Sequence, residues 1–237
     1  MSFPKFVSFL KDGLFMPNGK AFEDKWEGLL PVKNQRNKEC EQSYIDTFQS
    51  LAQWIYVSCW HKEECENYAM WKIYGQISEA LAIETTMDKL KMAYFNNYPN
   101  TLAYLHEVEY VLKENQEQDY YSRVLKPINK RPFQVGIGQN DYHLKFFFFK
   151  DKGFKFEHEV RLVALDESYN LKASNTKAGI YVNFKSVESF IQKVKISPTA
   201  PRWFEGLVSD LLNRYGIDTE IEHSRFFEQP PSFSRLS

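Results

Sequence analysis

The sequence has no stretch long and apolar enough to cross a membrane as a helix. A spanning helix needs about 20 consecutive, mostly apolar residues, and no window of this chain approaches that length; the mean hydropathy is −0.51. The first residues, MSFPKFVSFLKDG, place lysines inside a short apolar run and offer no small-residue cleavage site. We therefore expect neither a signal peptide nor a membrane partner.

Cysteine and net charge are also scarce. The three cysteines, Cys40, Cys59 and Cys65, are an odd number without the spacing of a disulfide framework, which favours a reducing cytoplasm. Lys and Arg total 30 against 31 Asp and Glu, a formal net charge of −1. No overall field therefore attracts nucleic acid or an anionic membrane. A small nucleotide-like ligand and a protein both stay open as partners.

Aromatic residues are what the chain has in excess: 20 Phe, 14 Tyr and 5 Trp in 237 residues. A chain of this length buries a substantial core. Strand-like and helix-like segments are mixed without regular βαβ units, which predicts an α+β fold with a central, largely antiparallel sheet flanked by short helices. We expect one domain over residues 1–237, with a loose tail from about residue 226.

The stretch from Trp54 to Glu84 carries the first candidate site. An apolar strand is expected at 54–57, followed by Ser58 and Trp60, and then a short helix carries Trp71 and Tyr74. A serine and several aromatics with polar atoms near the ends of elements suggest a pocket. The helical spacing of Trp71 and Tyr74 is equally typical of a plain core helix.

The segment from Phe156 to Leu165 carries the second candidate site. Strand alternation would place Glu157, Glu159 and Arg161 on one face. A carboxylate held ionised by an arginine can act as a general base or stabilise a developing cation. The alternative is an exposed strand face with an ion pair that contributes little to stability.

The section 123–155 leans basic and contains the run Phe146–Phe149, which suits a buried strand or an apolar helix. With aromatics interspersed, this section could bind a phosphate-bearing ligand or single-stranded nucleic acid, or it could be a solvated loop beside a core element. Its basic residues are Arg123, Lys126, Lys130, Arg131, Lys145, Lys150, Lys152 and Lys155.

Two other patterns lack what their chemistry requires. Cys59, His61 and Cys65 contain no CxxC pair and have no fourth ligand nearby, so no metal site is expected. A Cys59 nucleophile with His61 as its base lacks a third, orienting group. Gly136-Ile137-Gly138 lacks the third glycine of a dinucleotide-binding loop and is interpreted as a turn.

Four stretches together resemble one family: LKDGLFMPNGKAFEDKWEG, YVSCWHKEECENYAMWKIYG with ALAIE, FEHEVRLV, and VKISPTAPRWFEGLVSDLLNRYGIDTEIEHS. Their order is similar to that in the bacterial and phage proteins grouped as domain of unknown function 2971. The resemblance implies an intracellular prokaryotic α+β protein without an established activity. It adds Asp24 and Glu27 to the candidate residues already named. The opening strand usual in the family is not expected here, because this chain starts almost at its first helix.

The element order of that family is similar to that of ADP-ribosyltransferase-like toxins, a likeness at the level of fold. The likeness implies that Trp71 and Tyr74 stack on the nicotinamide of NAD, that Ser58 supports the site and that Glu159 stabilises an oxocarbenium-like ribose. NAD would then be a substrate, and the setting would be a toxin or phage-defence system. A non-catalytic module for a nucleotide-like ligand and a nucleic-acid-acting protein that uses section 123–155 are the alternatives.

Overall fold

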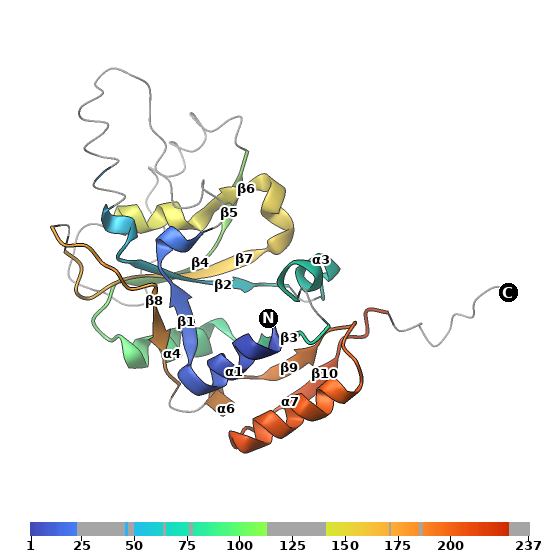
Figure 1. The fold of residues 1–237 in the computed structure, drawn as a ribbon. Helices are drawn as coiled ribbons and strands as arrows, with labels where there is room; N and C mark the ends of the chain where they lie inside the picture. Colours follow the sequence, from blue (N-terminus) through green and yellow to red (C-terminus); the bar gives the residue numbers. More distant parts are fainter. Residues whose placement is uncertain are drawn as a thin grey trace. The chain divides into compact units, whose positions relative to one another are not determined.

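The computed structural model describes residues 1–22, 46, 50–63, 65–75, 78–112, 141–170, 172–184 and 187–227. Their contacts group the chain into two compact units, one formed by Met1–Gly13, Glu63–Leu90 and Phe184–Ser237 and the other by Leu14–Lys62 and Lys91–Asn183. Across the two units, the described residues form short helices and strand pairs of which most are antiparallel, which confirms the α+β class (Figure 1). The single domain over 1–237 stays a prediction, and most of the expected tail lies outside the described residues.

The sheet that positions the candidate site lies in the second unit. Strand β7 (Glu159–Leu165) is its middle strand, with β2 (Ile55–His61) on one side and β4 (Ala103–Glu107) on the other, both antiparallel (Figure 1). Two smaller pairs belong to the same unit: β1 (Leu14–Pro17) is antiparallel to β8 (Gly179–Val182), and β5 (Glu109–Val111) is parallel to β6 (Phe149–Asp151).

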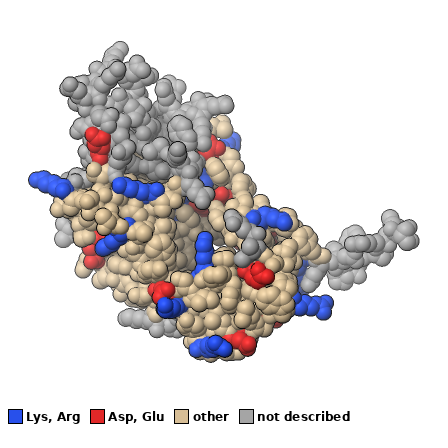
Figure 2. Space-filling view, viewed as in Figure 1, with Lys and Arg blue, Asp and Glu red and all other residues tan. Residues whose placement is uncertain are grey.

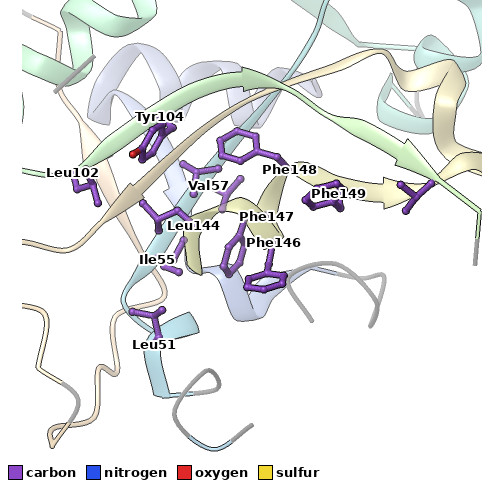
Figure 3. Packing of buried hydrophobic residues seen from close by; sticks show 12 residues of the cluster. Leu51, Ile55, Val57, Leu102, Tyr104, Leu144, Phe146, Phe147, Phe148 and Phe149 are labelled. Carbon is purple, nitrogen blue, oxygen red and sulfur yellow. The ribbon is translucent and has the colours of Figure 1, made fainter. Parts of the chain in front are cut away.

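The phenylalanine run forms the core against one face of this sheet. Residues Asp141–Phe148 form a 3₁₀ helix, η4, and Phe149 opens β6, so the run is neither one strand nor one α-helix. All four rings are buried and pack with Ile55 and Val57 of β2 and Val163 of β7 (Figure 3). A short helix that is apolar on most sides is stable only when it is covered in this way.

The strand predicted at 156–165 has different bounds from those expected. It begins only at Glu159, because Lys152–Glu157 form a 3₁₀ helix, η5, and His158 adopts a left-handed backbone with φ 42° and ψ 52°. Strands β4 and β5 are separated at Val108 and have different partners. Alternation along one strand therefore does not explain the position of Glu157.

The first unit contains the sheet β3 (Leu81–Glu84), β9 (Lys193–Ile196) and β10 (Glu220–His223), in which β9 is antiparallel to β3 and parallel to β10. Its helices are α1 (Phe3–Asp12), α3 (Tyr68–Met70) with the π-helix η2 (Trp71–Gly75), α6 (Val187–Phe190) and α7 (Trp203–Arg214). Helix α4 (Met87–Asn97) includes residues of both units.

Glycine ends helix α1, and helix α7 buries one face. Helix α1 stops where Gly13 takes φ 96°, the conformation that favours glycine. Helix α7 buries Phe204, Val208 and Leu212, whereas Leu207 is 41% exposed. In the described part of the chain, no helix is long and apolar enough to cross a membrane.

Gly19 and Gly206 provide a test of the packing in each unit. A Cβ at Gly19 would lie 2.6 Å from the ring of Phe147 and 3.2 Å from the Ala52 carbonyl oxygen, so Gly19→Ala should lower the free energy of unfolding by about 1–3 kcal/mol. A Cβ at Gly206 in α7 would meet nothing within 4 Å, so Gly206→Ala should raise it by about 1 kcal/mol. Urea denaturation of both variants measures the difference. Equal effects would contradict the close approach of Gly19 to Phe147.

Candidate functional site

Four charged side chains meet in the second unit. Lys150 Nζ donates to Glu157 Oε2 at 2.5 Å and to Glu159 Oε1 at 2.7 Å. Arg161 Nε donates to the other oxygen of Glu159, Oε2, at 2.5 Å. We refer to Lys150, Glu157, Glu159 and Arg161 as the charged cluster.

Three consecutive elements of the chain bring the cluster together. Lys150 lies in β6, Glu157 ends η5, and the left-handed His158 then turns the chain into β7, where Glu159 and Arg161 share one face by alternation. Backbone contacts fix the arrangement. The Glu159 N–H donates to the Tyr110 hydroxyl at 2.8 Å, and Arg161 Nη1 donates to the Phe147 carbonyl at 2.9 Å.

The cluster is shielded from water. None of its side chains is more than 8% exposed, and that of Arg161 is 0% exposed. Aromatic rings contact both cations: the centroid of Phe154 lies 4.7 Å from Lys150 Nζ, and that of Phe22 lies 5.0 Å from Arg161 Cζ. The face of an aromatic ring attracts a cation, so the two rings stabilise the buried charges.

The two carboxyl groups of the cluster have opposite pKa shifts. Burial and the interaction with Glu159 raise the pKa of Glu157 to about 7, although Lys150 opposes the change. Burial would also raise the pKa of Glu159, but its interactions with Glu157, Arg161 and Lys150 outweigh burial and lower that pKa to about 2. Two acids beside one lysine therefore divide into a permanent anion and a group that holds a proton near neutral pH.

This division determines what the cluster can do chemically. Glu157 can accept or release a proton near neutral pH, which is the requirement for a general acid or base. Glu159 remains ionised and fixed by two cations, so it can orient a partner or face a developing positive charge. With both carboxylates ionised, the cluster is neutral. With Glu157 protonated, it carries one positive charge.

Ser58 and Trp60 do not join the cluster. Ser58 lies opposite Leu162 and Trp60 opposite Val160, whereas His61 lies opposite Glu159. Directly paired residues of antiparallel strands point to the same face and neighbours along a strand to opposite faces, so Ser58 and Trp60 are on the other face of the sheet from Glu159. There, Trp60 Nε1 donates to Ser58 Oγ at 2.9 Å. The expected pocket that combines Ser58 with Glu159 is wrong in this respect.

Four predicted site residues remain: Trp71, Tyr74, Asp24 and Glu27. Trp71 and Tyr74 belong to the first unit, in η2. The Trp71 indole donates to Glu66 Oε2 at 3.0 Å, and Tyr74 is 50% exposed. Asp24 and Glu27 lie outside the described residues.

Lys150 is the member of the cluster that the sequence did not identify. In the sequence, Lys150 belongs to the basic section 123–155. Nothing in its spacing indicated that the 3₁₀ helix η5 would bring it into contact with Glu157 and Glu159. Lys145 and Lys150 are both buried, so they cannot form a nucleic-acid surface, whereas Lys152 and Lys155 are exposed. The basic residues at 123–131 lie outside the described residues. On the face shown in Figure 2, Lys and Arg side chains are interspersed with those of Asp and Glu among the described residues.

Cys59 and Cys65 are exposed. Within the described ranges, no three His, Cys, Asp or Glu residues are grouped so that they could hold a metal ion. Cys40 lies outside these ranges. Neither described cysteine takes part in the charged cluster.

Comparison with known proteins found one family whose model covers the residues of the charged cluster. Residues 70–162 match the model of the family described as a protein of unknown function (DUF2971). The chain carries a DUF2971 region. This match confirms the predicted family. No curated protein and no solved structure matches the chain.

The DUF2971 region contains all four residues of the charged cluster together with Trp71 and Tyr74. Ser58, Trp60 and the opening and closing stretches that also suggested the family lie outside the matched residues. The match therefore covers Lys150 as well as the two glutamates and the arginine.

The ion pairs of the cluster should contribute far more to the free energy of unfolding than ion pairs at the surface. Lys150→Met leaves two buried acids with one cation fewer and should lower the free energy of unfolding by about 3–5 kcal/mol. Lys62→Met is the matched control, because the pair of Lys62 with Glu107 is solvent-exposed and should contribute about 0–1 kcal/mol. Urea denaturation distinguishes the two. An equal, small loss for both variants would contradict the electrostatic role of Lys150.

Glu157 should make the protein less stable as the pH rises toward neutral. The folded state keeps the Glu157 proton up to about pH 7, whereas an unfolded glutamate releases it near 4.5. The contribution of this group is therefore complete below pH 4.5 and is lost as the pH rises through 7. Glu159, with its lowered pKa of about 2, does the reverse and loses its contribution as the pH falls from 4.5 to 2.

Glu157→Gln, which keeps a neutral side chain at every pH, isolates this effect. The urea midpoint of the parent should fall between about pH 5 and about pH 8 by more than that of the variant, because other titrating groups are common to both. Parallel pH profiles for the two proteins would show that Glu157 does not hold the proton.

Proposed function

We propose that the charged cluster performs carboxylate-assisted chemistry on a nucleotide-like ligand, and that the reaction is ADP-ribose transfer from NAD. The single observation that carries the proposal is the pairing of Glu157 and Glu159 around Lys150, with Lys150 Nζ 2.5 Å and 2.7 Å from their oxygens. Such a pair supplies one fixed anion and one proton-exchanging group in a single place.

The proposed reaction uses these two groups in different roles. The bond between nicotinamide N1 and ribose C1′ breaks, and its electron pair leaves with nicotinamide. The positive charge that develops at C1′ faces the Glu159 carboxylate. An acceptor then attacks C1′, and its proton passes to the Glu157 carboxylate.

Lys150 and Arg161 hold Glu159 in one orientation but also reduce the negative charge that it offers to C1′. We therefore assign Glu157 a larger role in the reaction than the sequence pattern of Phe156–Leu165 suggested. The cluster is buried and the ring of Phe154 lies over Lys150, so the proposed reaction requires side chains around the cluster to move when a ligand binds. The resemblance to toxin-like transferases supports NAD as the donor. It also supports a prokaryotic cytoplasm and a toxin or phage-defence setting.

The experiment is incubation with NAD and a cell extract, with nicotinamide and modified acceptors measured by mass spectrometry. We expect nicotinamide release that falls about 100-fold or more in Glu159→Gln and in Glu157→Gln, because each removes a group that acts on the reacting atoms. Glu107→Gln is the matched control, since it removes an exposed carboxylate of the same sheet. Thermal unfolding of every variant separates loss of chemistry from loss of fold.

Two outcomes would overturn the proposed enzymatic activity. One is the absence of nicotinamide release by the parent, and the other is Glu157→Gln and Glu159→Gln variants as active as the parent. Saturable NAD binding without release would instead identify the non-catalytic module, and calorimetry on the same samples measures that binding.

A further inference from the structure

A second site lies at the other end of the central sheet. Asp166 directly follows β7, seven residues beyond Glu159, which at about 3.3 Å per strand residue is roughly 23 Å away. Here the second unit forms a cavity of about 260 Å³ that is partly open to solvent. Its lining includes Tyr56 of β2, Tyr94 of α4, Tyr98, Asp166 and Lys177.

The hydroxyl groups of the three tyrosines that line this cavity all bind protein atoms. The Tyr56 hydroxyl donates to Asp166 Oδ2 at 2.7 Å, and that of Tyr98 donates to the Tyr181 carbonyl at 2.8 Å. The Tyr94 hydroxyl shares a hydrogen bond of 2.9 Å with Thr101. Tyr56 and Tyr94 are each only 1% exposed, so the aromatic and apolar surface within reach of a ligand comes from the half-buried Tyr98, Leu165 and Ile180.

Hydrogen bonds hold the Asp166 carboxylate in place, so that it can bind a cation. Its Oδ1 accepts from the Ser168 N–H at 2.8 Å and from the Ser168 hydroxyl at 2.6 Å. Its Oδ2 accepts from Tyr56, and the Lys177 ammonium lies 3.5 Å away, beyond a good hydrogen bond. Burial would raise the pKa of Asp166, but Ser168, Tyr56 and Lys177 together lower it, so the group is ionised at neutral pH.

Lys177 is a loosely held partner for this carboxylate. Its side chain is 58% exposed, whereas that of Asp166 is 8% exposed. An exposed lysine at 3.5 Å gains little from the contact. Asp166 and Glu167 both line the cavity against this one cation, so the site carries one negative charge in excess.

From this arrangement we propose that the cavity binds a protonated amine carried on a small apolar or aromatic body. The ammonium group hydrogen-bonds Asp166 Oδ2 in the place that Lys177 approaches, and the body packs on Tyr98, Leu165 and Ile180. Charge-assisted hydrogen bonds to a carboxylate and cation–π contacts are the two interactions that such a lining provides. The site is independent of the charged cluster and of the reaction proposed there.

The test uses three probes of similar shape and different charge: benzylamine, benzyl alcohol and benzoate. Titration of the full chain, followed by tyrosine fluorescence or NMR, should show saturable binding of benzylamine that is about tenfold or more tighter than that of benzyl alcohol, since the buried carboxylate favours the cation. Benzoate should not compete. Equal binding of all three probes, tightest binding of benzoate, or no saturable binding of benzylamine would overturn the proposal.

Substitutions of two exposed lysines test whether the cavity prefers a cation or an anion. Lys177→Met removes the competing cation and should tighten benzylamine several-fold, whereas an anion site would lose affinity with the same change. Lys172→Met is the matched control, because it removes an exposed lysine of the same loop that does not line the cavity. Asp166→Asn should abolish the preference for the amine, and its melting temperature checks that the chain still folds. Unchanged or weaker benzylamine binding by Lys177→Met would overturn the assignment even if Asp166→Asn unfolds.

Discussion

The neutralisation of Arg161 is the constraint on which the second unit depends. This guanidinium lies in the middle strand of the sheet and is fully buried. An ion in such a place has an effective desolvation penalty of several kcal/mol unless partners surround it. Glu159, the Phe147 carbonyl and the ring of Phe22 provide those partners. The 3₁₀ helix η4 thus has two roles, since it fills the core with phenylalanine rings and directs one carbonyl at the arginine.

Once Glu159 is bound to Arg161, the rest of the cluster follows from the same electrostatics. Lys150 compensates the second carboxylate, and the proximity of two acids separates their pKa values. The left-handed His158 makes this possible, because it lets the chain turn from η5 into β7 and bring Glu157 back to the lysine. A non-glycine residue in that conformation is uncommon, and it stands between the two glutamates that the site requires.

Strand β7 therefore joins two polar sites with different electrostatics. At its beginning, Glu159 is balanced by two cations in a closed cluster. Just beyond its end, Asp166 is held by hydroxyl and backbone donors and faces a cavity lined by tyrosine. The middle of the strand, Val160 to Leu165, is apolar apart from Arg161 and anchors the core on both sides. This rigid segment places both carboxylates on a stable scaffold.

By itself, the sequence determined the local features of the protein. The α+β class, the strand beginning near Trp54 and the shared face of Glu159 and Arg161 follow from periodicity and residue chemistry over a few neighbours. It did not determine where β7 begins, because the left-handed turn at His158 leaves no signature in a non-glycine residue. Only the tertiary structure decided that Lys150 completes the cluster and that Ser58 points to the opposite face from Glu159. These facts depend on strand register and on contacts between different elements, in which each residue's role is set by partners distant in sequence.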